Sequence, residues 1–218
     1  MNIYNNIISS KESNKKSFAL LIDPDKQDKE ELISIIDKAK DAKIDFFFVG
    51  GSLLTHDSLN TCIETIKENS EIPVILFPGN AMQVNCKADG ILFLSLISGR
   101  NADMLIGKQV ITAPILKQSG LEVISTGYML IESGKATTAS YMSNTTPIPA
   151  DKTAVAACTA MAGEMLGLNL IFMDGGSGAK NPITKEMISS VRKSVDYPLI
   201  IGGGISSGKK AIENCRAG

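Results

Sequence analysis

Carboxylates, hydroxyls and glycines stand directly after several apolar stretches of this 218-residue chain. The first such stretch ends in LIDPDK, so that Asp23 and Asp25 lie on either side of a proline. Magnesium in proteins takes one or two carboxylates together with substrate phosphate oxygens, and these aspartates offer such carboxylates. The alternative is an Asp-Pro turn in which Asp25 caps the helix that follows. The motif alone leaves both interpretations open, and a phosphate site elsewhere in the chain favours the metal.

A glycine-rich segment late in the chain has the composition of a phosphate-binding loop. IIGGGISSGKKA places Gly203 and Gly204 between an apolar run and serines that can cap a helix. Glycines let backbone N–H groups approach an oxyanion, and a helix start favours negative charge. The alternative is a tight turn, but three consecutive glycines exceed what a turn requires.

A second segment of this kind is FMDGGSGAKNP, in which Gly175, Gly176 and Gly178 surround Ser177. The hydroxyl of Ser177 is available for the same phosphate, with a structural turn as the alternative. The segment is not a nucleophile elbow, because it lacks the G-x-S-x-G spacing and the single histidine, His56, is a poor triad candidate.

Further polar candidates end two other apolar stretches. Ser52, in VGGSLLT, has a hydroxyl that can bind a hard cation, or it caps a turn or helix. Tyr128 and Glu132, in GYMLIESGK, are four residues apart and therefore share one face of a strand. Glu132 is a candidate general base, with a solvated loop carboxylate as the alternative. The Ser/Thr-rich segment that follows suits a lid over a ligand.

Seven short apolar runs precede or contain these residues, and most are continuous rather than alternating. Such runs are typical of parallel strands buried on both faces. They cover residues 17–23, 45–51, 73–79, 90–98, 121–133, 169–178 and 197–205. Helical spacing predicts helices over 30–42, 58–69, 151–166 and 184–195, with a last helix running to Gly218.

The β-α order fits two α/β folds, an open doubly wound sheet and a closed TIM (β/α)8 barrel. Polar and glycine signals after nearly every strand favour the barrel, whose loops at one end share one site. A doubly wound sheet would concentrate them at one switch point. We expect one barrel domain over residues 1–218, with the last strand and helix absent from this sequence, because only seven strands are counted.

Composition excludes several classes of function. The net charge of −1 gives no basic face for nucleic acid. The four cysteines form no CxxC pair and are interpreted as reduced thiols of a cytoplasmic protein. One histidine excludes a three-histidine zinc site, and no apolar run is long enough for a membrane span.

With these residues in place, the chain resembles the geranylgeranylglyceryl phosphate synthase family, including its bacterial members often called PcrB-like. The resemblance runs from about Ser17 to the end and looks most like the group with archaeal and Bacteroidetes enzymes. It depends on an ordered set of motifs: LIDPDK, FVGGSLLT, ILFPGN, GYMLIESGKATT, PIPADK, AGEMLGL, DGGSGA and IIGGGI.

The resemblance implies a Mg²⁺-dependent prenyltransferase on a TIM barrel. The family joins a long prenyl diphosphate to the 3-hydroxyl of sn-glycerol-1-phosphate in ether-lipid synthesis, and group membership favours geranylgeranyl. By the same match, Asp23 and Ser52 would hold Mg²⁺, while Glu132 would orient or deprotonate the hydroxyl with Tyr128 nearby. The implied contacts to the glycerol phosphate are Phe172, Met173, Asp174, Gly175, Gly176, Ser177, Gly178, Gly203 and Gly204. The family also implies a homo-oligomer, a dimer or a hexamer. We expect at most peripheral membrane contact, because the sequence contains no basic amphipathic helix.

The match has departures, and two other functions compete with it. Phe172 stands where the family usually has tyrosine, and Met173-Asp174 replaces the commoner Leu-Glu. The family's last phosphate contact, a Gly-Asn pair, would lie beyond Gly218. The alternatives are another phosphate-binding TIM-barrel isomerase or lyase, and a non-catalytic barrel that only binds phosphate compounds.

Overall fold

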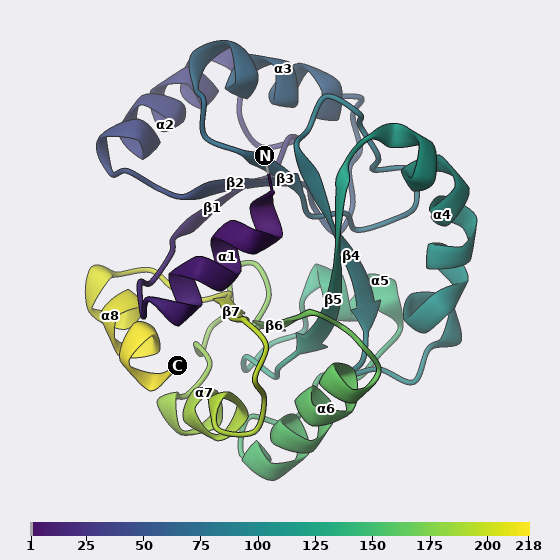
Figure 1. The fold of residues 1–218 in the computed structure, drawn as a ribbon, viewed down its shortest axis with the longest axis vertical. Coiled ribbons are helices and arrows are strands. Elements are labelled where there is room, and N and C mark those ends of the chain that lie inside the picture. Colours follow the sequence, from purple (N-terminus) through teal and green to yellow (C-terminus); the bar gives the residue numbers. More distant parts are fainter. Residues whose placement is uncertain (1) are drawn as a thin grey trace. The chain divides into compact units, whose positions relative to one another are not determined.

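Seven parallel strands are present in the computed structural model, which describes residues 2–218, and helices separate all neighbours in sequence except β3 and β4 (Figure 1). All seven predicted strands are confirmed, each inside its predicted range. Continuous burial explains their apolar runs: every residue of β2, β3 and β6 is buried. The strands are β1 (Ala19–Ile22), β2 (Phe46–Val49), β3 (Val74–Leu76), β4 (Gly90–Leu96), β5 (Glu122–Leu130), β6 (Leu170–Asp174) and β7 (Leu199–Gly202).

The order of strands in the sheet follows their order in the sequence, from β1 to β7. The pairs between β1 and β4 and between β5 and β7 are parallel. A doubly wound sheet reverses its strand order at a switch point, and this sheet has no reversal. The sequential order therefore excludes the doubly wound alternative.

The five predicted helices are confirmed, and three further helices were not predicted. One of these three, α4, was not predicted because its apolar residues do not form one face: Val110, Ile111 and Ile115 are exposed. The helix also contains Pro114. The helices are α1 (Ile3–Glu12), α2 (Lys29–Asp41), α3 (Leu59–Asn69), α4 (Lys108–Ser119), α5 (Thr138–Ser143), α6 (Thr153–Met165), α7 (Lys185–Arg192) and α8 (Gly208–Ala217), and a π-helical turn, η1 (Asp103–Gly107), precedes α4.

The described residues form two compact units, and unit 1 comprises those up to Phe93 together with Val110–Ile124. Its core packs strands against α2 and α3, which lie side by side in Figure 1. The first turn of α1 lies at the starts of β4 and β5. There Ile3 and Tyr4 donate their N–H groups to the Glu122 carboxylate at 2.5 and 2.7 Å. This places α1 at the amino ends of those strands, away from the loops that carry Asp23 and Ser52.

Unit 2 comprises Leu94–Gln109 and Ser125–Gly218. Its core packs β5, β6 and β7 against α6 and α7, and α7 also packs against α8 (Figure 1). Small residues let α6 approach closely, since a Cβ on Gly163 would lie 2.8 Å from Ile97 Cδ1. The apolar composition of this helix is thus explained in part by packing within its own unit, although Met165 and Leu166 at its end are exposed.

Two predictions concern the chain as a whole: a single domain, and the lack of a membrane-spanning segment. The single-domain assignment for residues 1–218 stays a prediction. Within residues 2–218, no helix has both the length and the apolar character needed to span a bilayer. Cys62 is buried and Cys86, Cys158 and Cys215 are exposed, all as free thiols.

Candidate functional site

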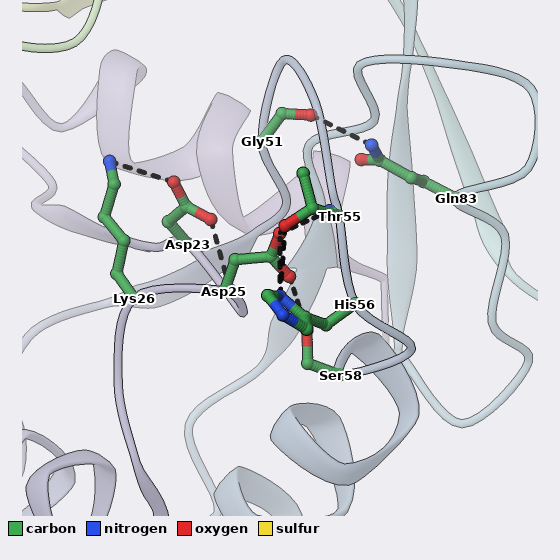
Figure 2. Close-up of polar contacts among 8 residues, drawn as sticks. All are labelled: Asp23, Asp25, Lys26, Gly51, Thr55, His56, Ser58 and Gln83. Carbon is green, nitrogen blue, oxygen red and sulfur yellow. Dashed lines mark hydrogen bonds and ion pairs between the residues drawn. The ribbon is translucent and has the colours of Figure 1, made fainter.

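Asp23 immediately follows β1 and lies against the loop that follows β2. Its Oδ2 pairs with Lys26 Nζ at 2.9 Å, and its Oδ1 accepts the Asp25 N–H at 3.3 Å (Figure 2). A Cβ on Gly51 would lie 3.3 Å from Oδ1, a tight contact, so the absence of a side chain at Gly51 helps this loop to pass close to the carboxylate. Two separate loops of unit 1 therefore meet at Asp23.

Asp25 does not cap α2, so that interpretation of the sequence was wrong. The cap is Asp28, whose side chain accepts the Glu31 N–H. Asp25 instead turns toward the loop after β2, where its carboxylate accepts the N–H and hydroxyl of Thr55 and the hydroxyl of Ser58 (Figure 2). No local sequence pattern indicates these contacts, because they join residues thirty or more positions apart.

These donors change the acidity of Asp25. The backbone N–H of Thr55, followed by the Ser58 hydroxyl, lowers the pKa of the Asp25 carboxyl to about 2. Hydrogen bonds to the ionised form stabilise it over the neutral acid. Asp25 therefore remains charged through any physiological pH and holds the two loops together.

A third loop is joined to the same place by Gln83, which sequence reasoning missed. Gln83 is buried; its Nε2 donates to the Gly51 carbonyl at 2.9 Å, and its Oε1 accepts the Gly79 N–H at 3.0 Å (Figure 2). A buried glutamine that pairs two loop backbones satisfies polar groups that would otherwise be costly to bury. This fixes the backbone next to Ser52. We call Asp23, Asp25, Lys26, Gly51, Ser52, Thr55, Ser58 and Gln83 the aspartate region.

The oxygen donors of the aspartate region fit a hard cation such as Mg²⁺. Asp23 offers a carboxylate that is partly exposed, and the Ser52 hydroxyl makes no hydrogen bond among the described residues. Magnesium often keeps water and substrate oxygens in most of its positions, so one carboxylate and one hydroxyl suffice. The part of the chain that the structure describes contains no cluster of three or more His, Cys, Asp or Glu suited to a metal. The chemistry thus fits a metal shared with a phosphate ligand rather than a closed protein site.

In unit 2, Asp174 ends β6 and lies buried beneath two glycine turns. Its Oδ2 accepts the Tyr128 hydroxyl at 2.5 Å, and its Oδ1 accepts the Gly176 N–H at 2.6 Å. Burial raises the pKa of the Asp174 carboxyl despite both hydrogen bonds, and burial followed by the Asp174 charge raises that of Tyr128. Adjacent strands position Asp174 and Tyr128, since Tyr128 on β5 is the register partner of Phe172, which lies two residues before Asp174 on β6.

The glycines around Asp174 are required by the backbone. Gly203 has φ +81°, and a Cβ there would lie 2.6 Å from Gly176 N and 2.9 Å from Asp174 Oδ1. Gly176 has φ +84°, and its Cβ would lie 2.6 Å from a methyl carbon of Thr137. The tight-turn interpretation of both segments is therefore confirmed.

Free donors are present on the same turns. Within residues 2–218, the backbone N–H groups of Ser177, Gly178, Gly203 and Gly204 make no hydrogen bond. Free N–H groups on neighbouring glycine turns are suited to bind an anion. We call Tyr128, Glu132, Lys135, Thr137, residues 172–178, Gly203 and Gly204 the glycine region.

Two predicted contacts of the glycine region lie in the interior. Phe172 is buried and stacks edge-on against Tyr128, with ring centroids 5.7 Å apart. Met173 is fully buried in the core of unit 2. Their side chains thus support the turn, and contact with a ligand would fall to their backbone.

Glu132 follows β5 and is exposed. Its N–H donates to the Ile148 carbonyl at 2.8 Å, and its carboxylate accepts the Ala150 N–H at 3.4 Å. The predicted lid segment is partly ordered as α5, capped by a reciprocal pair of Thr137 and Ser140. The hydrogen-bond partner of Tyr128 is Asp174 rather than Glu132, which sequence spacing had placed beside it.

Comparison with known proteins decides the family. The PcrB family model matches residues 10–218. The chain belongs to the PcrB family. A geranylgeranylglyceryl phosphate synthase from Chitinophaga pinensis is 54% identical over 216 residues, which cover 99% of this chain and 86% of the relative.

Solved structures agree with this family assignment. A synthase of this kind from Thermoplasma volcanium is 31% identical, with a TM-score of 0.92 over 100% of this chain and 87% of its own. The Thermoplasma acidophilum enzyme, solved with its substrate sn-glycerol-1-phosphate, is 29% identical, with a TM-score of 0.94 and the same coverage. The predicted resemblance and the TIM-barrel-like α/β fold are therefore confirmed for this member of the PcrB family.

Proposed function

We propose that this chain transfers a geranylgeranyl group from its diphosphate to the 3-hydroxyl of sn-glycerol-1-phosphate, releasing diphosphate. The likeness to the T. acidophilum synthase, which binds sn-glycerol-1-phosphate, carries this proposal because it extends over the whole chain. The relative from Chitinophaga pinensis bears the name of the same activity. The predicted function, a prenyltransferase of ether-lipid synthesis, agrees with both.

The aspartate region supplies the diphosphate end of this reaction. Asp23 and Ser52 would hold Mg²⁺, which when bound stabilises negative charge on a departing phosphate group. Lys26, which now pairs with Asp23, is a second cation within reach of such a group. Asp25 and Gln83 contribute by fixing the loops that carry Asp23 and Ser52.

The glycine region supplies the acceptor end. The free N–H groups of Ser177, Gly178, Gly203 and Gly204 suit the phosphate of sn-glycerol-1-phosphate. Anchoring the phosphate of so small an acceptor also positions its hydroxyl, which lowers the entropic part of the barrier.

Two carboxylates of this region can accept the hydroxyl proton. Glu132 is the predicted base, and Asp174 is a second candidate that the structure adds. A general base works best when its pKa approaches the working pH. Burial raises the pKa of Asp174, which favours it as the base, with Tyr128 holding its carboxylate in place.

We also propose a homo-oligomer, a dimer or hexamer, working in the cytoplasm. Exposed apolar residues on α6, namely Val155, Met165 and Leu166, offer contact area for another copy. Free cysteines are typical of reducing compartments.

Transfer of labelled geranylgeranyl diphosphate to sn-glycerol-1-phosphate, with and without Mg²⁺, tests the function. We expect an ether product that disappears when the metal is chelated. A product that forms equally well in chelator, or none with any prenyl diphosphate, contradicts the proposal. Turnover of another phosphorylated metabolite without metal would support the isomerase or lyase alternative.

A further inference from the structure

Lys135 brings a positive charge to the second glycine turn. Its Nζ lies 3.3 Å from the position that a Cβ on Gly178 would occupy. Among the described residues, no carboxylate pairs with Lys135, whereas Lys152 and Lys210 of the same unit both have acidic partners. Lys135 is an exposed residue, its ammonium group lies close to the turn, and no acidic side chain among the described residues neutralises it.

The backbone around Lys135 is held on both sides. Before it, the Ser133 carbonyl accepts the Asn181 N–H at 2.9 Å. After it, Thr137 caps α5 and packs its side chain against Gly176. The fold of this segment therefore places the backbone of Lys135 beside the turn, within reach of its ammonium group.

The free N–H groups and the ammonium point to one kind of ligand. Ser177 and Gly178 have free backbone N–H groups beside Lys135 Nζ. Backbone donors fix the geometry of an oxyanion, and a lysine adds a full charge to the same oxyanion. The Asp174 carboxylate of the same region accepts hydrogen bonds from Tyr128 and Gly176, and it forms no ion pair with Lys135.

We propose that Lys135 binds the phosphate group of the acceptor and thereby sets the affinity of the enzyme for that substrate. This inference depends on the proposed function for the identity of the acceptor, but not for the existence of the anion site. Lys135 is a positioning residue: its ammonium group holds the phosphate and does not contact the atoms that form the ether bond.

The test compares Lys135→Met and Lys135→Arg with Lys193→Met. Lys193 is an exposed lysine at the end of α7 in the same unit and serves as the matched control. The Met variant should raise KM for sn-glycerol-1-phosphate by about tenfold, the usual effect of losing one exposed charge-assisted contact. KM for geranylgeranyl diphosphate and kcat at saturating acceptor should stay within about twofold, and Arg should restore most of the loss.

Other outcomes overturn the proposal. An unchanged KM for the acceptor in Lys135→Met does so, as does an equal change in Lys193→Met or a parallel change for both substrates. Calorimetric titration of the intact protein with sn-glycerol-1-phosphate and with inorganic phosphate separates this inference from the proposed function. If transfer fails in the wild type, weaker binding of either phosphate by Lys135→Met still supports the anion site, and equal binding refutes it.

Discussion

The aspartate region and the glycine region shift the pKa of a buried or hydrogen-bonded carboxyl group in opposite directions. Asp25 and Asp174 each accept at least two hydrogen bonds, yet the pKa of Asp25 is lowered to about 2 and that of Asp174 is raised. Asp25 lies under one surface loop, whereas Asp174 is enclosed at the end of β6 by the glycine turns. Enclosure therefore outweighs hydrogen bonding in the glycine region but not in the aspartate region.

This difference separates two chemical tasks. A carboxylate with a lowered pKa stays ionised and helps to bind a cation, whereas a carboxylate with a raised pKa is a stronger base for a proton. On this view the aspartate region handles a diphosphate and a metal, and the glycine region handles a hydroxyl that must lose a proton.

Loss of Asp23 should have the largest effect. Asp23→Ala removes the only carboxylate proposed to hold the metal, so transfer should fall at least about thousandfold, since metal stabilisation contributes several kcal/mol. Steady-state transfer at increasing Mg²⁺ measures this. Asp37→Ala, which removes an exposed aspartate paired with Lys40 on α2, should retain nearly full activity. Activity of Asp23→Ala within tenfold of wild type would leave LIDPDK without its proposed role.

The next effect distinguishes the two carboxylates of the glycine region. Asp174→Asn should lower kcat by about 10²- to 10³-fold, within the usual range for general-base catalysis, and Glu132→Gln should lower it less. Single-turnover rates at saturating substrates measure the chemical step. The reverse ranking would identify Glu132 as the base and reduce Asp174 to a support for its turn.

The pH dependence of kcat/KM in Tyr128→Phe tests whether Asp174 is the base. The Tyr128 hydroxyl bond lowers the pKa of Asp174 against the effect of burial, so its removal should raise that pKa further. If Asp174 is the base, the acid limb of the kcat/KM profile moves to higher pH in Tyr128→Phe. A limb that stays in place while activity falls uniformly would argue that Tyr128 is only structural.

Substitutions at three glycines distinguish the energetic cost of backbone strain from that of steric crowding. Gly203→Ala meets both a positive φ and the Gly176 nitrogen, so it should destabilise the fold by about 2–5 kcal/mol. Gly120→Ala has φ +75° with nothing within 4 Å, and should cost about 1–2 kcal/mol. Gly208→Ala has neither problem and begins α8, so it should be neutral or stabilising. Urea unfolding of the three variants gives these values, and equal losses at positions 203 and 120 would show that crowding around Asp174 is unimportant.

The sequence predicted what depends on local patterns. Runs such as Phe46–Val49 mark strands because both faces of a parallel sheet are buried. The glycine turns were predicted as ligand loops, and their positive φ values explain why glycine is needed there. In contrast, the sequence did not predict α4, because the apolar residues of this helix are not confined to one face.

Contacts between distant segments lie outside such patterns. The sequence left Asp25 as either a metal carboxylate or a helix cap, and the partners that the structure gives it belong to the next loop along the sheet. Gln83 is a similar case: it is an ordinary polar residue in the sequence and gains its role from burial beside another backbone. Asp174 was predicted as a contact of the glycerol phosphate, but its hydrogen bond with Tyr128 and its raised pKa follow from burial in the fold. Lys135 became a candidate only when the fold brought it to Gly178.

The smallest expected effect concerns the charge of Asp25 and the stability of the protein. Its folded pKa of about 2 lies below the ordinary value of 3.8, so its hydrogen bonds favour the folded state above about pH 4 and lose this effect as the pH falls through 2. Asp25→Asn should therefore unfold at lower urea than wild type at pH 7, and the difference should narrow between pH 4 and pH 2.

Asp28→Asn is the matched control, because asparagine caps a helix about as well as aspartate does. Its urea midpoint should follow that of the wild type with no comparable change in this pH range. A constant gap between Asp25→Asn and wild type from pH 7 to 2 would mean that the loops are held by the shape of the side chain and not by its charge. The contrast with Asp174 would then depend on burial alone.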